Sequence, residues 1–187
     1  MDFSFDYEKL KLAIWELDLK RSNNFDYLEN IQALYGNYSA KIKKITWELG
    51  LRLEATQLDI QNGFTKPSYV NWFPSASFVN EISNKESLSF SLSTRISRPS
   101  YSSLNPFISF ADPINLNAGN PNLQPERAIL LEFSHTKDWN NFSMSNQLFM
   151  RNIDGLVSRV RTQLEGDTTL TRFENLAHSR SIGFENM

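Results

Sequence analysis

Large apolar residues alternate with serines along residues 87–93, where Leu88, Phe90 and Leu92 are separated by single serines. The same two-residue period appears at residues 45–53 and again at 129–135. A helix would mix the two residue types on one surface, because its side chains three or four positions apart share a face. The pattern therefore predicts β-strands that form a sheet with one apolar face and one polar face.

Turn-forming residues separate further periodic segments over the whole chain, so we expect an all-β protein. The expected strands are residues 2–8, 25–40, 45–59, 71–79, 87–96, 127–137, 142–153, 156–163 and 170–175, with a last strand opening at Arg180. This predicts about nine or ten strands that run up and down.

The connections between these strands come in two sizes. The short ones are residues 41–44, 80–86 and 138–141, and the long ones are residues 9–24, 60–70 and 97–126. Short and long connections alternate, which places all the long loops at one end of the sheet. Transmembrane β-barrels have this arrangement, with short periplasmic turns and long external loops. The alternation favours an antiparallel transmembrane β-barrel segment.

The phase of each strand assigns its side chains to lipid or to the barrel interior. The residues placed toward lipid are Leu88, Phe90, Leu92, Phe142, Met144 and Leu148, with Ile45, Trp47, Leu49, Leu51 and Leu53 on an earlier strand. The charged residues placed toward the lumen are Glu48, Arg52, Glu54 and Glu132. Charges beside an apolar stripe need water or each other, so we interpret Glu48, Arg52 and Glu54 as a wall network rather than a substrate channel.

Composition narrows the function classes. The 19 basic and 21 acidic residues are dispersed, so the chain has no basic field for nucleic acid. It has no cysteine, and His135 and His178 are isolated, so we expect no catalytic site, metal site or cofactor and do not expect an enzyme. No apolar run has the length of a membrane-spanning helix, whereas a spanning strand needs only about 9–11 residues.

Several segments resemble the barrel region of TonB-dependent outer-membrane receptors, and most closely the outer membrane protein beta-barrel family. The resemblance rests on Arg-Ile-Ser-Arg-Pro-Ser-Tyr at 95–101, Leu-Asn-Pro-Phe at 104–107, Asp-Pro at 112–113 and Gly-Asn-Pro-Asn-Leu-Gln-Pro-Glu at 119–126. Residues 25–33, 50–54, 73–77, 153–157, 173–176 and 181–185 are similar in the same order. The resemblance thus covers the chain from about Phe25.

This resemblance implies import of a large nutrient, such as a metal chelate or an oligosaccharide, across the cell outer membrane. It also implies contact with outer-membrane lipid, energy from the TonB complex and a surface lipoprotein as a further partner. Such receptors are plugged barrels of about 22 strands. We therefore expect residues 1–187 to be a single partial barrel domain, an internal fragment whose plug domain and remaining strands lie outside the chain.

The long connection at 95–126 is the candidate substrate loop, because long loops on rigid scaffolds commonly carry binding sites. Its five prolines make it stiff. Tyr101, Phe107 and Phe110 are its candidate capture residues, and folding on the rim for structural reasons is the alternative. Arg95 and Arg98 could contact an anionic substrate. We expect them instead to pair with Glu126 or Glu132 on the neighbouring strand.

Two other architectures fit part of the pattern. A soluble β-sandwich that binds glycans would show the same alternation, but it requires a second sheet over Leu88, Phe90 and Leu92. A small outer-membrane barrel without transport is the other alternative. A loop of about 30 residues is large for so narrow a barrel mouth, and an unclosed strand edge is not tolerated in lipid.

Overall fold

The computed structural model describes residues 24–60, 68–109, 112–176 and 178–187. The strand expected at residues 2–8 and the candidate capture residue Phe110 lie outside these ranges. Within them the chain is built almost entirely of strands, with one short helix, α1 (Tyr101–Leu104). No helix of the described residues is long and apolar enough to cross a membrane.

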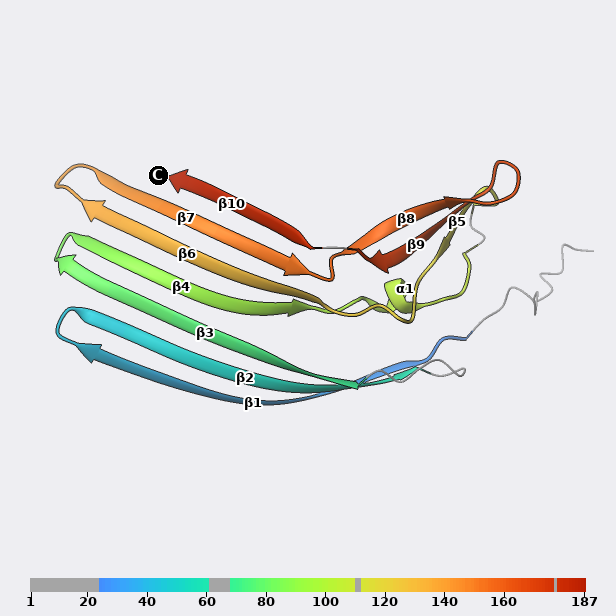
Figure 1. Ribbon diagram of the computed structural model, residues 1–187, viewed down its shortest axis with the longest axis horizontal. Coiled ribbons are helices and arrows are strands. Elements are labelled where there is room, and N and C mark those ends of the chain that lie inside the picture. The colour runs from blue at the N-terminus through green and yellow to red at the C-terminus, as the bar shows by residue number, and fades with distance from the viewer. Residues whose placement is uncertain (1–23, 61–67, 110–111, 177) are drawn as a thin grey trace, which may run out of the picture.

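Seven strands form one antiparallel sheet in the order β1-β2-β3-β4-β6-β7-β10. Their bounds are β1 (Tyr27–Ile42), β2 (Ile45–Ile60), β3 (Ser68–Ser83), β4 (Glu86–Ser97), β6 (Glu126–Asp138), β7 (Ser143–Asp154) and β10 (Ser179–Asn186). Three further strands, β5 (Asn115–Ala118), β8 (Val157–Gln163) and β9 (Thr169–Asn175), form a small sheet in the order β5-β9-β8. Figure 1 shows the seven strands as one curved wall, with the small sheet beyond the ends of β7 and β10.

The three short connections and the long connection at 97–126 are confirmed, whereas the expected long connections at 9–24 and 60–70 lie mostly outside the described residues. Residues 43–44, 84–85 and 139–142 join neighbouring strands of the wall at one end. At the other end, residues 98–125 join β4 to β6 and contain α1 and β5, while residues 155–178 join β7 to β10 and contain β8 and β9. We call these the short-turn end and the long-loop end of the wall.

The number of wall strands is smaller than expected. The strands expected at residues 156–163 and 170–175 were assigned to the wall, but β8 and β9 pair with each other beyond its end. Gly155, with a φ of +68°, separates β8 from β7, because few residues other than glycine adopt that conformation. The strand β5, which the alternation did not reveal, is only four residues long and pairs in parallel with β9.

Cross-strand register lines up large apolar residues across all seven wall strands. One row consists of Ala40, Trp47, Phe78, Phe90, Phe133, Leu148 and Phe184. The next row consists of Tyr38, Leu49, Ala76, Leu92, Leu131, Met150 and Ile182. We call these two rows the apolar belt. All the residues that sequence phase placed toward lipid on β2, β4 and β7 lie on this face of the sheet.

The apolar belt is open to the surroundings. Phe90 is 42% exposed, Phe133 47% and Phe184 66%. A soluble sandwich would need a second sheet over these residues, and no described residue forms one. Exposed apolar surface of this extent is unfavourable in water, so the face requires an apolar environment.

Pairing between β3 and β4 stops partway along the wall. The pair closest to the long-loop end is Ala76 with Leu92, and Pro74, which lacks the N–H that a ladder needs, lies two residues nearer that end on β3. Beyond this point β4 pairs with β6, and β3 pairs with β2. Figure 1 shows β3 and β4 diverging toward the long-loop end. The loop after β4 thereby gains room to fold back toward β2.

The buried core lies at the long-loop end, where the loop at residues 98–125 packs on the first strands. It consists of Phe25, Ile60, Leu104 and Leu123, with Tyr27, Phe107, Val157 and Phe173 packed around it. Ser100 caps α1 by accepting a hydrogen bond from the backbone N–H of Ser103. Tyr101 donates its hydroxyl hydrogen to the carbonyl oxygen of Phe25 at 2.7 Å. The loop is therefore an ordered part of the fold.

Gly119 holds α1 against the segment that follows β5. Its N–H donates to the carbonyl oxygen of Asn105 at 2.7 Å, and the N–H of Asn120 donates to that of Ser103 at 2.7 Å. A Cβ at residue 119 would lie 2.5 Å from both carbonyl oxygens. Because these obstacles are backbone atoms, a side chain fits only if the two segments separate.

We predict that Gly119→Ala loosens this contact by about 1–3 kcal/mol, the usual cost of overpacking a well-packed site. Hydrogen exchange of peptides covering residues 103–120 would then be about tenfold faster or more. Gly36→Ala is the control, because no atom lies within 4 Å of a Cβ at residue 36. Unchanged exchange in the Gly119 variant would contradict the packing described.

Candidate functional site

The loop at residues 98–125 and the small sheet line an open cavity of about 380 Å³ at the long-loop end. We call it the rim pocket. The loop contributes Tyr101, Ser102, Asn105, Phe107, Ser109 and Gly119, and the small sheet contributes Asn117, Ala118, Arg159, Thr171 and Phe173. Segments that lie far apart in sequence thus meet here through the pairing of β5 with β9.

The two described capture candidates, Tyr101 and Phe107, both line the rim pocket, and each also has a structural contact. The Tyr101 ring centroid lies 5.1 Å from that of Phe25 and 6.4 Å from that of Tyr27. Phe107 packs against the buried core. Tyr101 nevertheless remains 49% exposed. The contacts of both side chains agree with the structural alternative, a loop folded on the rim, and a role in capture stays a prediction.

The rim pocket has aromatic walls and one guanidinium group. The Cζ atom of Arg159 lies 5.4 Å from the ring centroid of Phe173, within the range of a cation–π contact. The remaining polar lining consists of hydroxyl and amide groups, and the lining contains no carboxylate. Such a cavity suits a ligand that has a flat apolar surface and a negatively charged group.

Arg159, Phe173 and Asn117 were not identified from the sequence, because their segments were expected to belong to the wall or to a loop without strands. One signal was available. Gly155 stands between the expected strands at 142–153 and 156–163, and a glycine at that point lets the chain leave the ladder.

Arg98 fastens the loop to the wall. Its Nη2 atom donates to Oε2 of Glu54, and its Nε lies 3.2 Å from Oε1 of Glu29. Glu54 is only 4% exposed and also pairs with Arg52 at 2.6 Å. Burial is the largest single influence and acts to lower the pKa of the Arg98 guanidinium, but hydrogen bonds and charge interactions with Glu54 and Tyr69 together outweigh it, so the pKa is raised.

The expected pairing of Arg98 with Glu126 or Glu132 is wrong. Glu126 accepts a hydrogen bond from the backbone N–H of Val157 at 2.8 Å. Glu132 accepts from the side chains of Ser91 at 3.1 Å and Gln147 at 2.7 Å. Where β3 and β4 separate, the chain after β4 turns toward β2 instead of β6. Arg98 consequently meets acidic residues of the first two strands.

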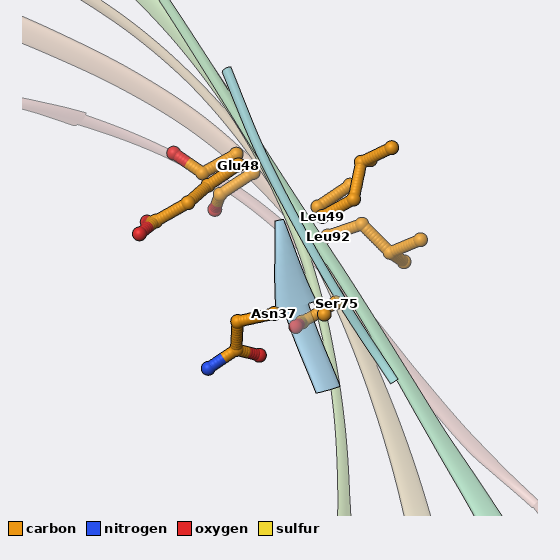
Figure 2. A pocket seen from close by; sticks show the side chains of 9 residues that line it. Asn37, Glu48, Leu49, Ser75 and Leu92 are labelled. Carbon is orange, nitrogen blue, oxygen red and sulfur yellow. The ribbon is translucent and has the colours of Figure 1, made fainter. Parts of the chain in front are cut away.

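Arg95, Glu48 and Arg52 lie on the face opposite the apolar belt, which we call the polar face. Arg95 is exposed in register with Ala128, and it has no ion pair among the described residues. Glu48 lines a second cavity, of about 280 Å³, together with Asn37 and Ser75. Figure 2 shows Asn37 and Glu48 on one side of the strands, with Leu49 and Leu92 on the other.

Gly50 makes this second cavity possible. A Cβ at residue 50 would lie 2.8 Å from Oδ1 of Asn37 and would also collide with Oγ of Ser75. The missing side chain lets these two polar groups converge on the polar face. No group of three or more His, Cys, Asp or Glu residues in the described ranges is arranged to hold a metal ion.

Solved structures of outer-membrane receptors have the same fold. The hemophore receptor HasR of Serratia marcescens, solved with HasA and heme, matches 84% of this chain with a TM-score of 0.71 and 12% identity. The copper transporter OprC matches 86% with a TM-score of 0.66 and 14% identity. The siderophore receptor PirA of Pseudomonas aeruginosa matches 86% with a TM-score of 0.55 and 12% identity.

The chain corresponds to only part of these receptors, covering 31% of HasR, 26% of OprC and 39% of PirA. A search of curated proteins gave no match. The sequence matches the family described as "Outer membrane protein beta-barrel family" over residues 1–187. The chain therefore belongs to the outer membrane protein beta-barrel family, and its seven-stranded sheet is a segment of an outer-membrane barrel wall.

Proposed function

We propose that this chain forms part of a receptor barrel that imports a nutrient across the outer membrane, and that the rim pocket takes part in capturing it. The observation that carries the proposal is a cavity with aromatic walls, a guanidinium group and no carboxylate at the long-loop end. In a barrel of this family the long loops are external, so a ligand would meet this pocket first.

An anionic metal chelate is the substrate class that best suits the rim pocket. Arg159 has no carboxylate partner within ion-pair distance among the described residues, so a negatively charged ligand would supply the missing counter-charge. Tyr101, Phe107 and Phe173 offer flat surfaces to a planar ligand. A neutral oligosaccharide would use the aromatic surfaces but would leave the guanidinium unpaired. The names of the structural relatives, which include siderophore and hemophore receptors, agree with this choice.

Uptake of a large ligand requires more than this wall. We infer that the remaining strands close the barrel, that a plug domain occupies its interior against the polar face, and that a TonB complex supplies energy. The polar groups around Glu48 and Gly50 would then face the plug. Arg52, Glu54 and Glu132 would be lumen-facing residues that hold the wall and the loop. Arg98 would keep the rim pocket assembled while the ligand binds.

We predict that Arg159→Gln weakens binding of an anionic ferric catecholate chelate about tenfold, because a charge-assisted hydrogen bond contributes about 1.5–3 kcal/mol. Equilibrium titration of the detergent-solubilised complete receptor would measure this. Arg172→Gln is the matched control, since Arg172 lies on the adjacent strand and its side chain takes the opposite face of the small sheet. Equal weakening by both variants, or tighter binding of a neutral oligosaccharide than of the chelate, would contradict the proposed substrate class.

A second prediction concerns Arg98. Arg98→Met leaves the buried Glu54 with only one of its two cationic partners, Arg52, and removes the link between the loop and β2, which destabilises the closed loop. Chymotrypsin should then cut after Tyr101 or Leu104 at least tenfold faster than in the unmodified protein. The double variant Arg98→Met with Glu54→Leu should recover much of the protection, because it removes both charges together. Arg95→Met, on the same strand–loop junction, should leave the cleavage rate unchanged, and an equal acceleration there would refute the role given to Arg98.

A further inference from the structure

The belt-bearing face of the wall changes abruptly from apolar to charged at the long-loop end of β6, β7 and β10. Directly beyond the apolar belt, register aligns Ile129, Asn152 and Arg180. The next row pairs Arg127 with Asp154. On β1, β2 and β3 the corresponding rows remain apolar or uncharged, with Leu51 beside Pro74 and Leu53 beside Trp72. The charged boundary is therefore confined to one side of the wall.

A cavity of about 560 Å³ lies at this boundary. Its lining consists of Ile129, Asn152, Asp154, His178, Ser179 and Arg180. Ile129 is the apolar residue of the lining, and Met150 and Ile182 of the belt lie in the next row on β7 and β10. A molecule seated here would thus touch charged groups at one end and an exposed apolar surface at the other.

Arg180 is oriented for an anion. Its Nε donates to Oδ1 of Asn152 at 2.7 Å, which fixes the guanidinium and leaves both Nη groups to other acceptors. No carboxylate of the described residues lies within ion-pair distance of it. The acidic group on the cavity, Asp154, lies 3.8 Å from Nδ1 of His178. Arg127, in register with Asp154, reaches toward the carbonyl oxygen of Trp72 at 3.4 Å and adds a second cation to this face.

We propose that this cavity binds the phosphate group of an outer-leaflet lipid, with the lipid's acyl chains lying along Ile129, Met150 and Ile182. We assign a lipid to this cavity because the row with Arg180 lies directly beyond the apolar belt. Lipid headgroups of a surrounding membrane meet the wall at this height. Basic groups at this depth attract anionic headgroups. The site lies on the belt face and shares no lining residue with the rim pocket, so it is distinct from the site proposed for nutrient capture.

Native mass spectrometry of the complete receptor in mild detergent tests this with two probes, bisphosphorylated lipid A and the same lipid without its phosphates. We expect the phosphorylated lipid to remain bound and the dephosphorylated lipid to bind at least fivefold more weakly. Arg180→Gln should reduce retention of the phosphorylated lipid about fivefold, the effect expected of one basic residue near a headgroup. Arg180→Lys should retain most of the binding.

Arg151→Gln is the matched control, because Arg151 lies on β7 in register with Ser181 and on the opposite face of the wall. This variant should bind lipid as the unmodified protein does. Equal retention of the two lipids by the unmodified protein would overturn the proposal, and this comparison needs no variant to fold. Equal losses in the Arg180 and Arg151 variants would overturn it as well. Binding of chelate at the rim pocket should be unaffected in either variant, which separates this site from nutrient capture.

Discussion

Backbone pairing in fixed register is the constraint on which this structure depends. Side chains alternate between the two faces of a strand, so a slip of one residue would carry every belt side chain to the polar face. The pairing register is continuous across all seven strands, so the side chains from Ala40 to Phe184 form one row. In lipid, unpaired backbone groups are costly as well, so the same ladder satisfies the backbone and separates the two environments.

The ion pair of Arg98 and the rim pocket both lie where the ladder of backbone hydrogen bonds is interrupted. Pro74 follows the end of pairing between β3 and β4, and the loop after β4 folds back so that Arg98 reaches Glu54. Gly155 ends β7 and allows β8 and β9 to rise as a hairpin, which β5 then joins. The rim pocket forms between the loop after β4 and the hairpin of β8 and β9. A uniform barrel wall would offer neither the loop nor the hairpin that encloses it.

Sequence alone predicted the wall well, because a two-residue period and turn residues are local signals. The strand expected at 87–96 is Glu86–Ser97, and that expected at 127–137 is Glu126–Asp138. Only some of the residues that line the rim pocket were predicted from the sequence. Tyr101 and Phe107 stand in a conspicuous loop, whereas Arg159 and Phe173 depend on the pairing of β5 with β9, which no local pattern encodes. The partner of Arg98 was missed for the same reason, since it depends on where the β3–β4 ladder stops.

The most direct test of the account is whether the apolar belt faces lipid. The chain contains no cysteine, so single cysteines at residues 88–93 can carry spin labels in the complete protein reconstituted into bilayers. We predict that labels at Leu88, Phe90 and Leu92 are accessible to oxygen dissolved in the bilayer, and that labels at Ser89, Ser91 and Ser93 are accessible to a water-soluble nickel chelate. Accessibility to the nickel chelate at all six positions would contradict the membrane wall.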